Sequence, residues 1–418
     1  MTTPPPVASP APSVEATGCP FHAGRPLPSD GMPLAPSPTI GAWRDEAAAT
    51  PLLYEDGHRG WIATRYELVR AVLEDPRFSQ QPMRMPANDG PRPDRFDDPT
   101  DAPAHAASDA ANLLGLDGEQ HLKIRRSLTS RFSVRSSRAA EPFVAEIVST
   151  QLEHLVAQGS PADLTEHFAQ PISALVHCRV LGVADHLAAR FIQTFVGAST
   201  AQQKVDFVRE ALDARRAALA DGDPGADTMS DLLRSELTRA EIEGAVLVLM
   251  TSGRDSVAYM IATTTVALLT HPEQLAALRQ DPALLSTAVE EFMRFGAMFV
   301  TLFPRTATED VTLEGVLIRQ GETVSVSPVG ANRDERHFER AEVFDVHRDA
   351  FGHLAFGHGG HGCIGQQLAR VEIRQAIGQL ITAVPSLFLV EAEQSTPMPF
   401  AHPVATYEAG SVIVGWEP

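Results

Sequence analysis

A glycine-rich stretch that ends in a cysteine offers the clearest chemistry in this chain. Residues 356–365 read FGHGGHGCIG, and the apolar periodicity that follows predicts a helix over residues 366–383. Glycines permit left-handed backbone angles and let a flat ligand approach the main chain. Beside a helix start, the Cys363 thiolate would be stabilised by N–H groups, so we expect a lowered pKa. Such a sulfur is a good soft ligand for iron. The stretch alone leaves open a plain glycine-rich turn with a buried cysteine.

A second informative segment is a long apolar helix predicted over residues 238–270. Thr238 and Glu241 form a capping-box pattern at its start, and His271-Pro272 ends it. About 30 residues at 1.5 Å each span roughly 45 Å, enough to cross a whole domain. Apolar residues cover nearly all of its sides, which predicts a buried helix.

The middle of this helix, residues 252–256, is polar. Ser252, Gly253, Arg254, Asp255 and Ser256 place a glycine, two charges and two hydroxyls in a buried setting. A helical glycine costs about 1 kcal/mol, and an unpaired buried charge costs more. Two interpretations follow. Either Arg254 and Asp255 form salt links to other helices, or the helix widens here to admit a small ligand, with a hydroxyl and an acid to deliver protons.

The cysteine stretch resembles the haem-binding loop of the cytochrome P450 family, F-G-x-G-x-H-x-C-x-G. It matches at all six fixed positions, which are Phe356, Gly357, Gly359, His361, Cys363 and Gly365. The resemblance implies one haem b with Cys363 as its axial ligand and with Phe356, Gly357 and Gly365 close to the cofactor. An axial thiolate pushes electron density towards iron and favours cleavage of the O–O bond.

Residues 252–256 resemble the family's oxygen-binding motif, A-G-x-[D/E]-T. Gly253 and Asp255 match it, Ser252 replaces the alanine, and Ser256 replaces the threonine whose hydroxyl helps to deliver protons. Serine keeps the donor but lacks the methyl group that restricts χ1. The resemblance therefore assigns catalytic roles to Ser252, Gly253, Asp255 and Ser256, with less precise proton delivery at Ser256.

Two further sets of residues occupy positions that match the family. Glu291 and Arg294, three apart on a predicted helix, can pair with each other, and Arg348 lies in the following segment that the family uses to complete a Glu-Arg-Arg network. That network would hold the cysteine loop in place. Four basic residues match the positions that bind the two haem propionates, since charged donors bond carboxylates strongly. They are His121, Arg125, Arg305 and His361.

The pattern of elements predicts a mainly α fold. A helix is expected over residues 66–74 and helices dominate residues 121–282, whereas short strands are expected at 60–64, 311–318, 323–329, 387–390 and 411–416. The resemblance implies the cytochrome P450 fold, a large helical domain with a small β-rich region around one haem. We expect residues 1–38, rich in Pro, Ala and Ser, to be a disordered leader, and residues 39–418 to form a single haem-thiolate oxygenase domain.

Composition limits the partners of this protein. A net charge of −19 argues against nucleic acid, and three scattered cysteines exclude a disulfide framework. No secretory signal or uninterrupted apolar span is evident, so we expect a cytoplasmic monomer without a membrane anchor. Residues 123–138 nevertheless hold one Lys and five Arg with no acid. This basic segment is either a solvated face or a docking patch for an acidic donor; the resemblance implies ferredoxin with its reductase.

The substrate is the least determined feature. By resemblance, the loop at 79–118, the central helix, residues 299–302 and the turn near residue 400 would line the pocket; the apolar candidates are Met83, Met85, Met250, Phe299, Leu302 and Phe400. They suggest an apolar or aromatic small molecule of secondary-metabolite type. Residues 161–164 and 176–182 are similar to bacterial members that oxidise or couple cyclic dipeptides, which suggests a tryptophan-containing cyclic dipeptide. Hydroxylation and oxidative coupling remain equally open.

Three alternatives to an oxygen-dependent enzyme remain at this stage. The altered motif at 252–256 allows a peroxide-driven haem enzyme. A non-catalytic haem sensor would have the same cofactor site. Finally, His353, His358, His361 and Cys363 could bind a metal ion without haem.

Overall fold

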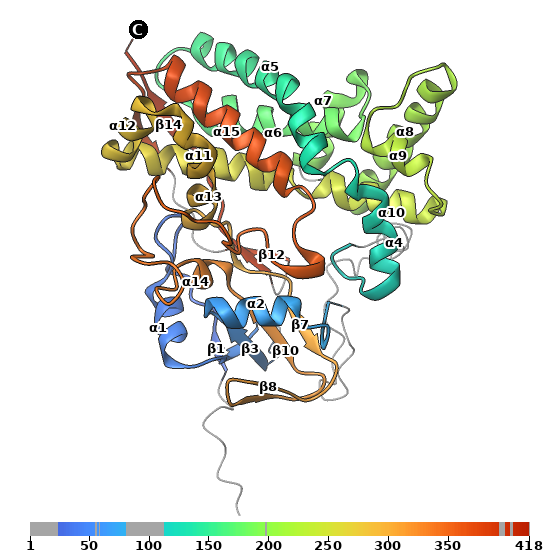
Figure 1. Cartoon of the computed structure of the whole chain (residues 1–418). Coiled ribbons are helices and arrows are strands. Elements are labelled where there is room, and N and C mark those ends of the chain that lie inside the picture. The colour runs from blue at the N-terminus through green and yellow to red at the C-terminus, as the bar shows by residue number, and fades with distance from the viewer. Residues whose placement is uncertain are drawn as a thin grey trace, which may run out of the picture.

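The protein combines a large helical part with four small β-sheets, as a computed structural model shows (Figure 1). The structure describes residues 24–54, 57, 59–80, 113–196, 199–392, 398–401 and 404–417. The helices are α1 (Pro38–Glu46), α2 (Tyr66–Glu74), α4 (Gly118–Thr129), α5 (Val134–Gln158), η3 (Thr165–Ala169), α6 (Gln170–Leu181), α7 (Asp185–Val196), α8 (Ala201–Ala220), α9 (Thr228–Leu233), α10 (Arg239–Thr251), α11 (Arg254–Thr270), α12 (Pro272–Gln280), η4 (Pro282–Leu284), α13 (Leu285–Phe295), α14 (Pro328–Asn332), η5 (Gly359–His361) and α15 (Gln366–Ala383).

The strands are short and form one mixed sheet and three smaller ones. In the six-stranded sheet the order is β1 (Arg25–Pro26), β2 (Thr50–Leu53), β3 (Arg59–Ala63), β10 (Thr323–Val326), β7 (Arg305–Ala307) and β4 (Phe78–Ser79). The others are β11 (Phe388–Ala392) with β14 (Val412–Gly415) and β5 (Ala162–Asp163); β12 (Met398–Ala401) with β13 (Val404–Thr406) and β6 (Phe299–Thr301); and the hairpin β8 (Val311–Leu313) with β9 (Val316–Ile318). In Figure 1, α2 lies over the six-stranded sheet, at the opposite end of the molecule from α5 and α15.

Three main hydrophobic clusters hold these elements together. The largest joins α5, α6, α11, α13 and α15; a second joins α4, α7, α8, α9 and α10; and a third lies between α2 and the six-stranded sheet. The α10–α11 run therefore passes from the second cluster into the first. Figure 1 shows it running across the molecule beneath α5 and α15. The predicted fold class, mainly α with a small β-rich region, is confirmed.

Several predicted elements agree with the structure, and others need correction. The helices at 66–74 and 366–383 are present as α2 and α15. The strand expected at 311–318 is a hairpin, because Glu314 and Gly315 both have positive φ and turn the chain. The strand expected at 323–329 ends at Val326, since Pro328 begins α14.

The helix expected over residues 238–270 is two helices. α10 ends at Thr251 and α11 begins at Arg254, with Gly253 in the left-handed region at a φ of +88°. A single glycine inside an apolar pattern is compatible with a continuous helix. The sequence therefore does not distinguish one long helix from two helices separated at Gly253.

The boundary of the expected leader was placed too late. Residues 24–38 contain β1, which pairs with β2, and the start of α1. Leu27 and Leu34 pack against the largest cluster, and the buried Ser37 side chain caps α1. Apolar residues scattered among prolines anchor this segment, although composition alone suggested disorder. Residues 1–23 lie outside the part of the chain that the structure describes.

One stretch, Arg239–Thr270, is long and apolar enough to cross a membrane by length and composition. Two thirds of its most apolar window is buried inside the protein (67%), as expected for the core helices of a globular domain.

Candidate functional site

The cysteine loop adopts a conformation that its glycines make possible. Gly357 and Gly359 have φ values of +68° and +69°, in the left-handed region that residues with a Cβ rarely adopt. At Gly359, a Cβ would also lie 2.9 Å from the Leu73 carbonyl oxygen on α2. The Cys363 N–H donates to the Phe356 carbonyl oxygen at 2.8 Å and closes the loop. The backbone thus fixes where the cysteine sulfur points.

The Cys363 thiol is accessible although protein atoms surround it densely. The residue is exposed, yet the surrounding atoms are dense enough that burial raises the pKa of its thiol. The predicted lowering is therefore wrong for the thiol by itself. The expected contributions exist, because N–H groups of Gly365 and Gln366 and the charges of Arg125 and Arg370 all lower the pKa, but burial outweighs them.

The four predicted basic residues converge beside this loop. His121 and Arg125 come from α4, Arg305 from β7 and His361 from η5; in Figure 1, α4, β7 and the loop before α15 lie close together. The rings of His121 and His361 lie 4.1 Å apart between centroids. Arg125 Nη2 donates to the Gly362 carbonyl oxygen at 2.5 Å, directly beside Cys363.

Burial leaves two polar nitrogens of this cluster, Arg305 Nε and His121 Nε2, without partners among the described residues. Burial lowers the pKa of Arg305 to about 10 and that of His121 to about 4, so at neutral pH Arg305 is charged and His121 is neutral. Among the described residues, buried Arg305 Nε and His121 Nε2 have no hydrogen-bond partner. An orphaned buried donor costs about 1–3 kcal/mol, which a bound acceptor would recover. These donors, next to an accessible thiol, fit the propionates of a haem whose iron binds Cys363.

Two residues of this cluster were missed from the sequence. Asp117 accepts from His361 Nε2 at 2.9 Å and from the Gln80 backbone N–H at 2.9 Å. With its side-chain amide oriented to satisfy both ends, Gln80 bonds Arg305 Nη2 at 3.1 Å and His361 Nδ1 at 2.9 Å. Asp117 precedes Gly118 at the start of α4, and an Asp at that position is a recognisable helix-start signal. Gln80 carries no comparable signal.

The second predicted group lies at the junction of α10 and α11. Thr251, Gly253 and Asp255 are exposed, whereas most residues on both sides of them along this run are buried. The Ser252 hydroxyl donates back to the Val248 carbonyl oxygen at 2.7 Å, and Ser256 is half-buried in the first turn of α11. An exposed strip in the middle of a buried helical run leaves the break accessible.

Arg254 and Asp255, the first two residues of α11, pair with each other just after the break. Their closest nitrogen and oxygen atoms lie 2.5 Å apart, and Arg254 Nη2 also donates to the Phe195 carbonyl oxygen on α7 at 2.7 Å. The Arg254 side chain is buried, whereas that of Asp255 is 56% exposed. The surrounding protein nevertheless raises the pKa of Asp255 more than Arg254 lowers it. The two charges thus pair with each other instead of each pairing with a charge on another helix, and Lys204 of α8 also lowers the pKa of Asp255.

Glu291, Arg294 and Arg348 contact one another as the predicted network requires. Arg294 donates to both Glu291 carboxylate oxygens, at 2.7 and 2.8 Å, and neither side chain is exposed. Arg348 Nε lies 3.3 Å from the same carboxylate. Arg294 Nη1 also donates to the carbonyl oxygens of Asn332 and Ala341, each at 2.7 Å. The network thus connects α13 with the end of α14 and with the chain that leads to the cysteine loop.

A parallel network, also missed from the sequence, reaches the cysteine loop itself. Glu290 binds Arg370 of α15 through two bonds of 2.6 and 2.8 Å and lies 3.2 Å from His353. Burial would raise the pKa of Glu290, but these two partners lower it to about 2. The Arg370 guanidinium lies 4.7 Å from the Phe356 ring centroid. Glu290 and Glu291 are adjacent in the sequence, and nothing in the sequence indicates that they belong to different networks.

The expected pocket residues have mixed outcomes. Met83 and Met85 lie outside the described residues, and Phe400 lies in β12, with its side chain outside the description. Met250 is fully buried in the second hydrophobic cluster, because its face of α10 packs inward. Leu302 is half-buried, 3.7 Å from where a Cβ on Gly357 would lie, and Phe299 is half-buried in β6. Leu302 thus lies beside the cysteine loop.

Two other predicted groupings can be judged from the contacts. In the basic segment, Lys123 pairs with Glu241 and Arg131 pairs with Asp231. Three arginines of this segment are exposed and have no partner among the described residues: Arg126, Arg135 and Arg138. The histidines considered for a metal site lie beside different acids. His353 Nε2 lies 3.2 Å from Glu290, His358 Nε2 lies 3.5 Å from Glu74, and His361 bonds Asp117. In the described part of the chain, no three His, Cys, Asp or Glu side chains gather into a metal site.

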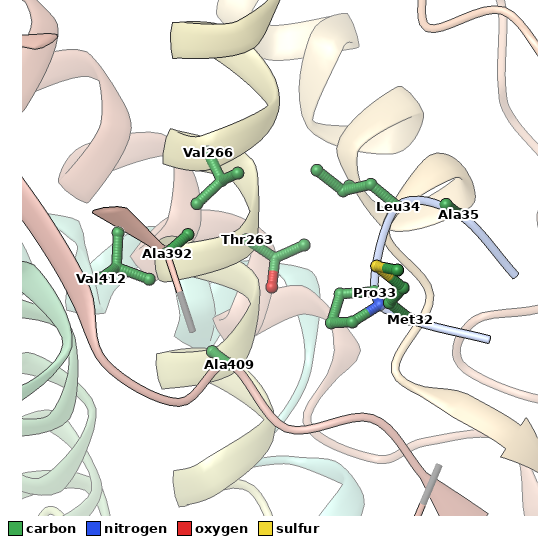
Figure 2. A pocket seen from close by; sticks show the side chains of 9 residues that line it. All are labelled: Met32, Pro33, Leu34, Ala35, Thr263, Val266, Ala392, Ala409 and Val412. Atoms are coloured by element: carbon green, nitrogen blue, oxygen red, sulfur yellow. The ribbon is translucent and has the colours of Figure 1, made fainter. Parts of the chain in front are cut away.

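A small apolar pocket lies elsewhere along α11. Figure 2 shows Thr263 and Val266 of α11 facing Met32, Leu34 and Val412, beyond the turns that hold the break. Its volume of about 70 Å³ is far too small for a haem. This pocket is therefore separate from the candidate site.

Comparison with known proteins identifies relatives along nearly the whole chain. Residues 185–403 match the family model described as Cytochrome P450. The chain is 35% identical to Cytochrome P450 105C1 of a Streptomyces species over 92% of this chain and 96% of that one. It is 36% identical to Nocardicin C N-oxygenase of Nocardia uniformis subsp. tsuyamanensis, over 88% and 93%. The solved structure of the mixed-function MycG protein in complex with mycinamicin V superposes with a TM-score of 0.80 and 30% identity, over 94% of this chain and all of that one.

Replacing Arg294 by Met should destabilise the protein by at least about 3 kcal/mol, because the fully buried Glu291 carboxylate would lose both of its strongest bonds. Thermal unfolding monitored by circular dichroism measures this. Arg319→Met is the matched control: Arg319 also pairs three residues away, with Glu322, but its side chain is 65% exposed, so we expect a change below about 1 kcal/mol. Equal effects of the two substitutions would contradict a structural role for the network.

Proposed function

Because the chain belongs to the cytochrome P450 family, we propose that it activates dioxygen to oxidise a small secondary-metabolite-type substrate, with Cys363 holding the haem iron. The protein is a cytochrome P450 monooxygenase with a haem-thiolate cofactor. The observation that carries the residue assignment is the accessible Cys363 sulfur beside a cluster of four basic residues, two of which have buried polar nitrogens without partners among the described residues.

The basic cluster would hold the two propionates. Arg305 brings a charge at neutral pH and an unbonded Nε, and His121 brings an unbonded Nε2 on a neutral ring. Arg125 would contact both a propionate and the loop, since it already bonds Gly362. His361, paired with Asp117, would complete the set. Phe356, Gly357 and Gly365 would lie against the macrocycle, and at Gly365 a Cβ would come within 4.0 Å of the sulfur.

The junction of α10 and α11 would form the oxygen side of the site. When bound, the haem supplies the redox chemistry; the protein orients the substrate, controls water and delivers protons. Asp255 suits proton transfer because it is accessible and its pKa is raised towards neutrality. Ser256 would pass the proton on through its hydroxyl, and Ser252 and Gly253 would shape the opening.

The substrate proposal rests on relatives and on the accessible residues. Nocardicin C and mycinamicin V, in the names of two relatives, are complex small molecules. Half-buried Phe299 and Leu302 would provide apolar contacts near the cysteine loop. The likeness to cyclic-dipeptide-oxidising members has only local support: residues 176–182 lie mostly in α6, where Cys178 and Leu181 are core residues. Spin-state titrations with mycinamicin V, nocardicin C and tryptophan-containing cyclic dipeptides would separate these candidates. No spin shift with the dipeptides would exclude them.

We expect Cys363→Ala to abolish activity, and with it the red-shifted Soret band that the carbon monoxide complex of a thiolate-bound haem shows. Cys178→Ala is the matched control, because Cys178 is buried in the second hydrophobic cluster and burial raises the pKa of its thiol to about 12. That variant should keep the band. A thiolate-type band in Cys363→Ala, or a wild-type protein that binds no haem, would contradict the proposal.

Asp255→Asn should retain haem but lower turnover about 10- to 100-fold, because the amide cannot donate an acidic proton. Turnover is measured with NAD(P)H, ferredoxin and ferredoxin reductase, together with the fraction of electrons recovered in product. The substitution Ser256→Thr restores the family's motif and should keep turnover or raise electron recovery. If Asp255→Asn has the turnover and electron recovery of the wild type, the Asp255 side chain has only a structural role.

Turnover with hydrogen peroxide alone, unaffected by Asp255→Asn, would favour the peroxide-driven alternative that the altered motif raises.

Electrons would come from a ferredoxin and its reductase, in a cytoplasmic setting and to a monomeric enzyme. The exposed arginines of the basic segment, Arg126, Arg135 and Arg138, provide an unneutralised positive surface in a chain of net charge −19. Reversing them to Glu should slow reduction by ferredoxin at least tenfold at low ionic strength and much less at high salt. Reversal of Arg239, which is exposed but paired with Glu243, is the control. Equal slowing by the control would contradict docking at this surface.

A further inference from the structure

His177 of α6 lies against the break between α10 and α11. Its Nε2 lies 2.7 Å from the Leu249 carbonyl oxygen, and a Cβ on Gly253 would lie 3.3 Å from its Cε1 atom. The carbonyl only accepts, so Nε2 carries the proton. Burial lowers the pKa of His177 to about 4, which keeps the ring neutral. The imidazole therefore donates to Leu249 at the end of α10 and fills the space beside Gly253.

The bond that His177 makes replaces a bond of a continuous helix. In an α-helix, the Leu249 carbonyl would accept from the N–H four residues later, which is that of Gly253. Here Gly253 has a φ of +88° and α11 begins anew at Arg254. A buried carbonyl without a partner is costly, so the break requires another donor for Leu249. His177 provides that donor.

A second residue of α6 holds the other side of the break. The Ser173 hydroxyl, one turn before His177, donates to the Arg254 carbonyl oxygen at 2.6 Å, and Ser173 is buried. Ser173 and His177 are four apart, so they share a face of α6. One helix face thus bonds the last part of α10 and the first residue of α11.

The packing places His177 where the two halves of the helical run separate. α10 is buried in the second hydrophobic cluster and α11 in the largest one, and α6 contributes to both. The His177 ring stacks at 6.0 Å on Phe191 of the second cluster. Hydroxyls of Thr251 and Ser252 also bond the Val248 carbonyl oxygen, at 3.0 and 2.7 Å, which favours a bend at the end of α10.

From these contacts we infer that His177, supported by Ser173, is a positioning residue that keeps α10 and α11 apart at Gly253 and so sets the geometry of Asp255 and Ser256. The inference rests on the proposed function of this junction as the oxygen side of the site. His177 touches neither substrate nor cofactor in this account. It acts through the backbone, by giving the Leu249 carbonyl a partner outside the helix.

Hydrogen exchange tests the inference without requiring activity. In His177→Ala the Leu249 carbonyl becomes available to the Gly253 N–H, so amides of residues 253–256 should exchange about five- to tenfold more slowly than in wild type. Loss of packing alone would make them exchange faster. His177→Gln keeps a side-chain donor and should retain the wild-type pattern, and His186→Gln, on an exposed position of α7, is the control. Faster or unchanged exchange in His177→Ala overturns the inference.

A double-mutant cycle provides a second measurement. Gly253→Ala should lower the melting temperature of the otherwise wild-type protein, because of the positive φ and the contact with His177. In the His177→Ala background the same change should leave the melting temperature unchanged or raise it, since alanine favours a continuous helix. Equal lowering in both backgrounds would show that something else holds the break.

The functional consequence is read from the haem-loaded protein with carbon monoxide as the probe. His177→Ala should keep the thiolate Soret band but shift the stretching frequency of the bound carbon monoxide, because Asp255 and Ser256 move; His177→Gln should shift it less. An unshifted frequency in His177→Ala would contradict the link between the break and the site. Absence of the thiolate band in wild type would instead refute the proposed function, while the exchange and melting results would still stand.

Discussion

The buried pair of Glu291 and Arg294 is the interaction on which the site most depends. Two charges with no exposed surface are stable only when every donor and acceptor is used. Arg294 bonds both carboxylate oxygens and carbonyls from two later segments, and Glu291 also accepts from the Asp345 N–H at 3.0 Å. These contacts fix the chain before the cysteine loop, and the neighbouring Glu290–Arg370 pair ties α13 to α15, with the Arg370 guanidinium over Phe356 of the loop. Cys363 is thereby held by rigid elements on both sides.

The proposed oxygen side of the site depends on a polar interruption between two apolar clusters. α10 and α11 are each buried by their own cluster, and the junction between them belongs fully to neither. Its backbone groups need partners from outside the helix, and α6 supplies them through Ser173 and His177. The resulting exposed strip places an acid of raised pKa and a hydroxyl in one turn. Hydrophobic packing thus decides where the polar chemistry can occur.

Sequence reasoning worked best where a residue type has one physical use. Residue types and spacing predict the positive-φ glycines around Cys363 and the i,i+3 pair of Glu291 and Arg294. The family resemblance implies the convergence of His121, Arg125, Arg305 and His361. Sequence reasoning failed where tertiary context chooses among allowed local structures. Gly253 fits a continuous helix as well as a break, and the partner that decides, His177, lies 76 residues earlier in the chain. The thiol pKa of Cys363 was predicted in the wrong direction because burial depends on the whole fold.

The central claim is that Cys363 binds haem iron while the basic cluster holds the propionates. A crystal structure of the haem-loaded protein tests it most directly. We predict an iron–sulfur bond to Cys363, with propionate oxygens bonded to Arg305 Nε and His121 Nε2, the two buried donors that lack partners among the described residues. Iron held by a histidine, propionates directed away from α4 and β7, or a metal ion bound among His353, His358 and His361 would contradict the account.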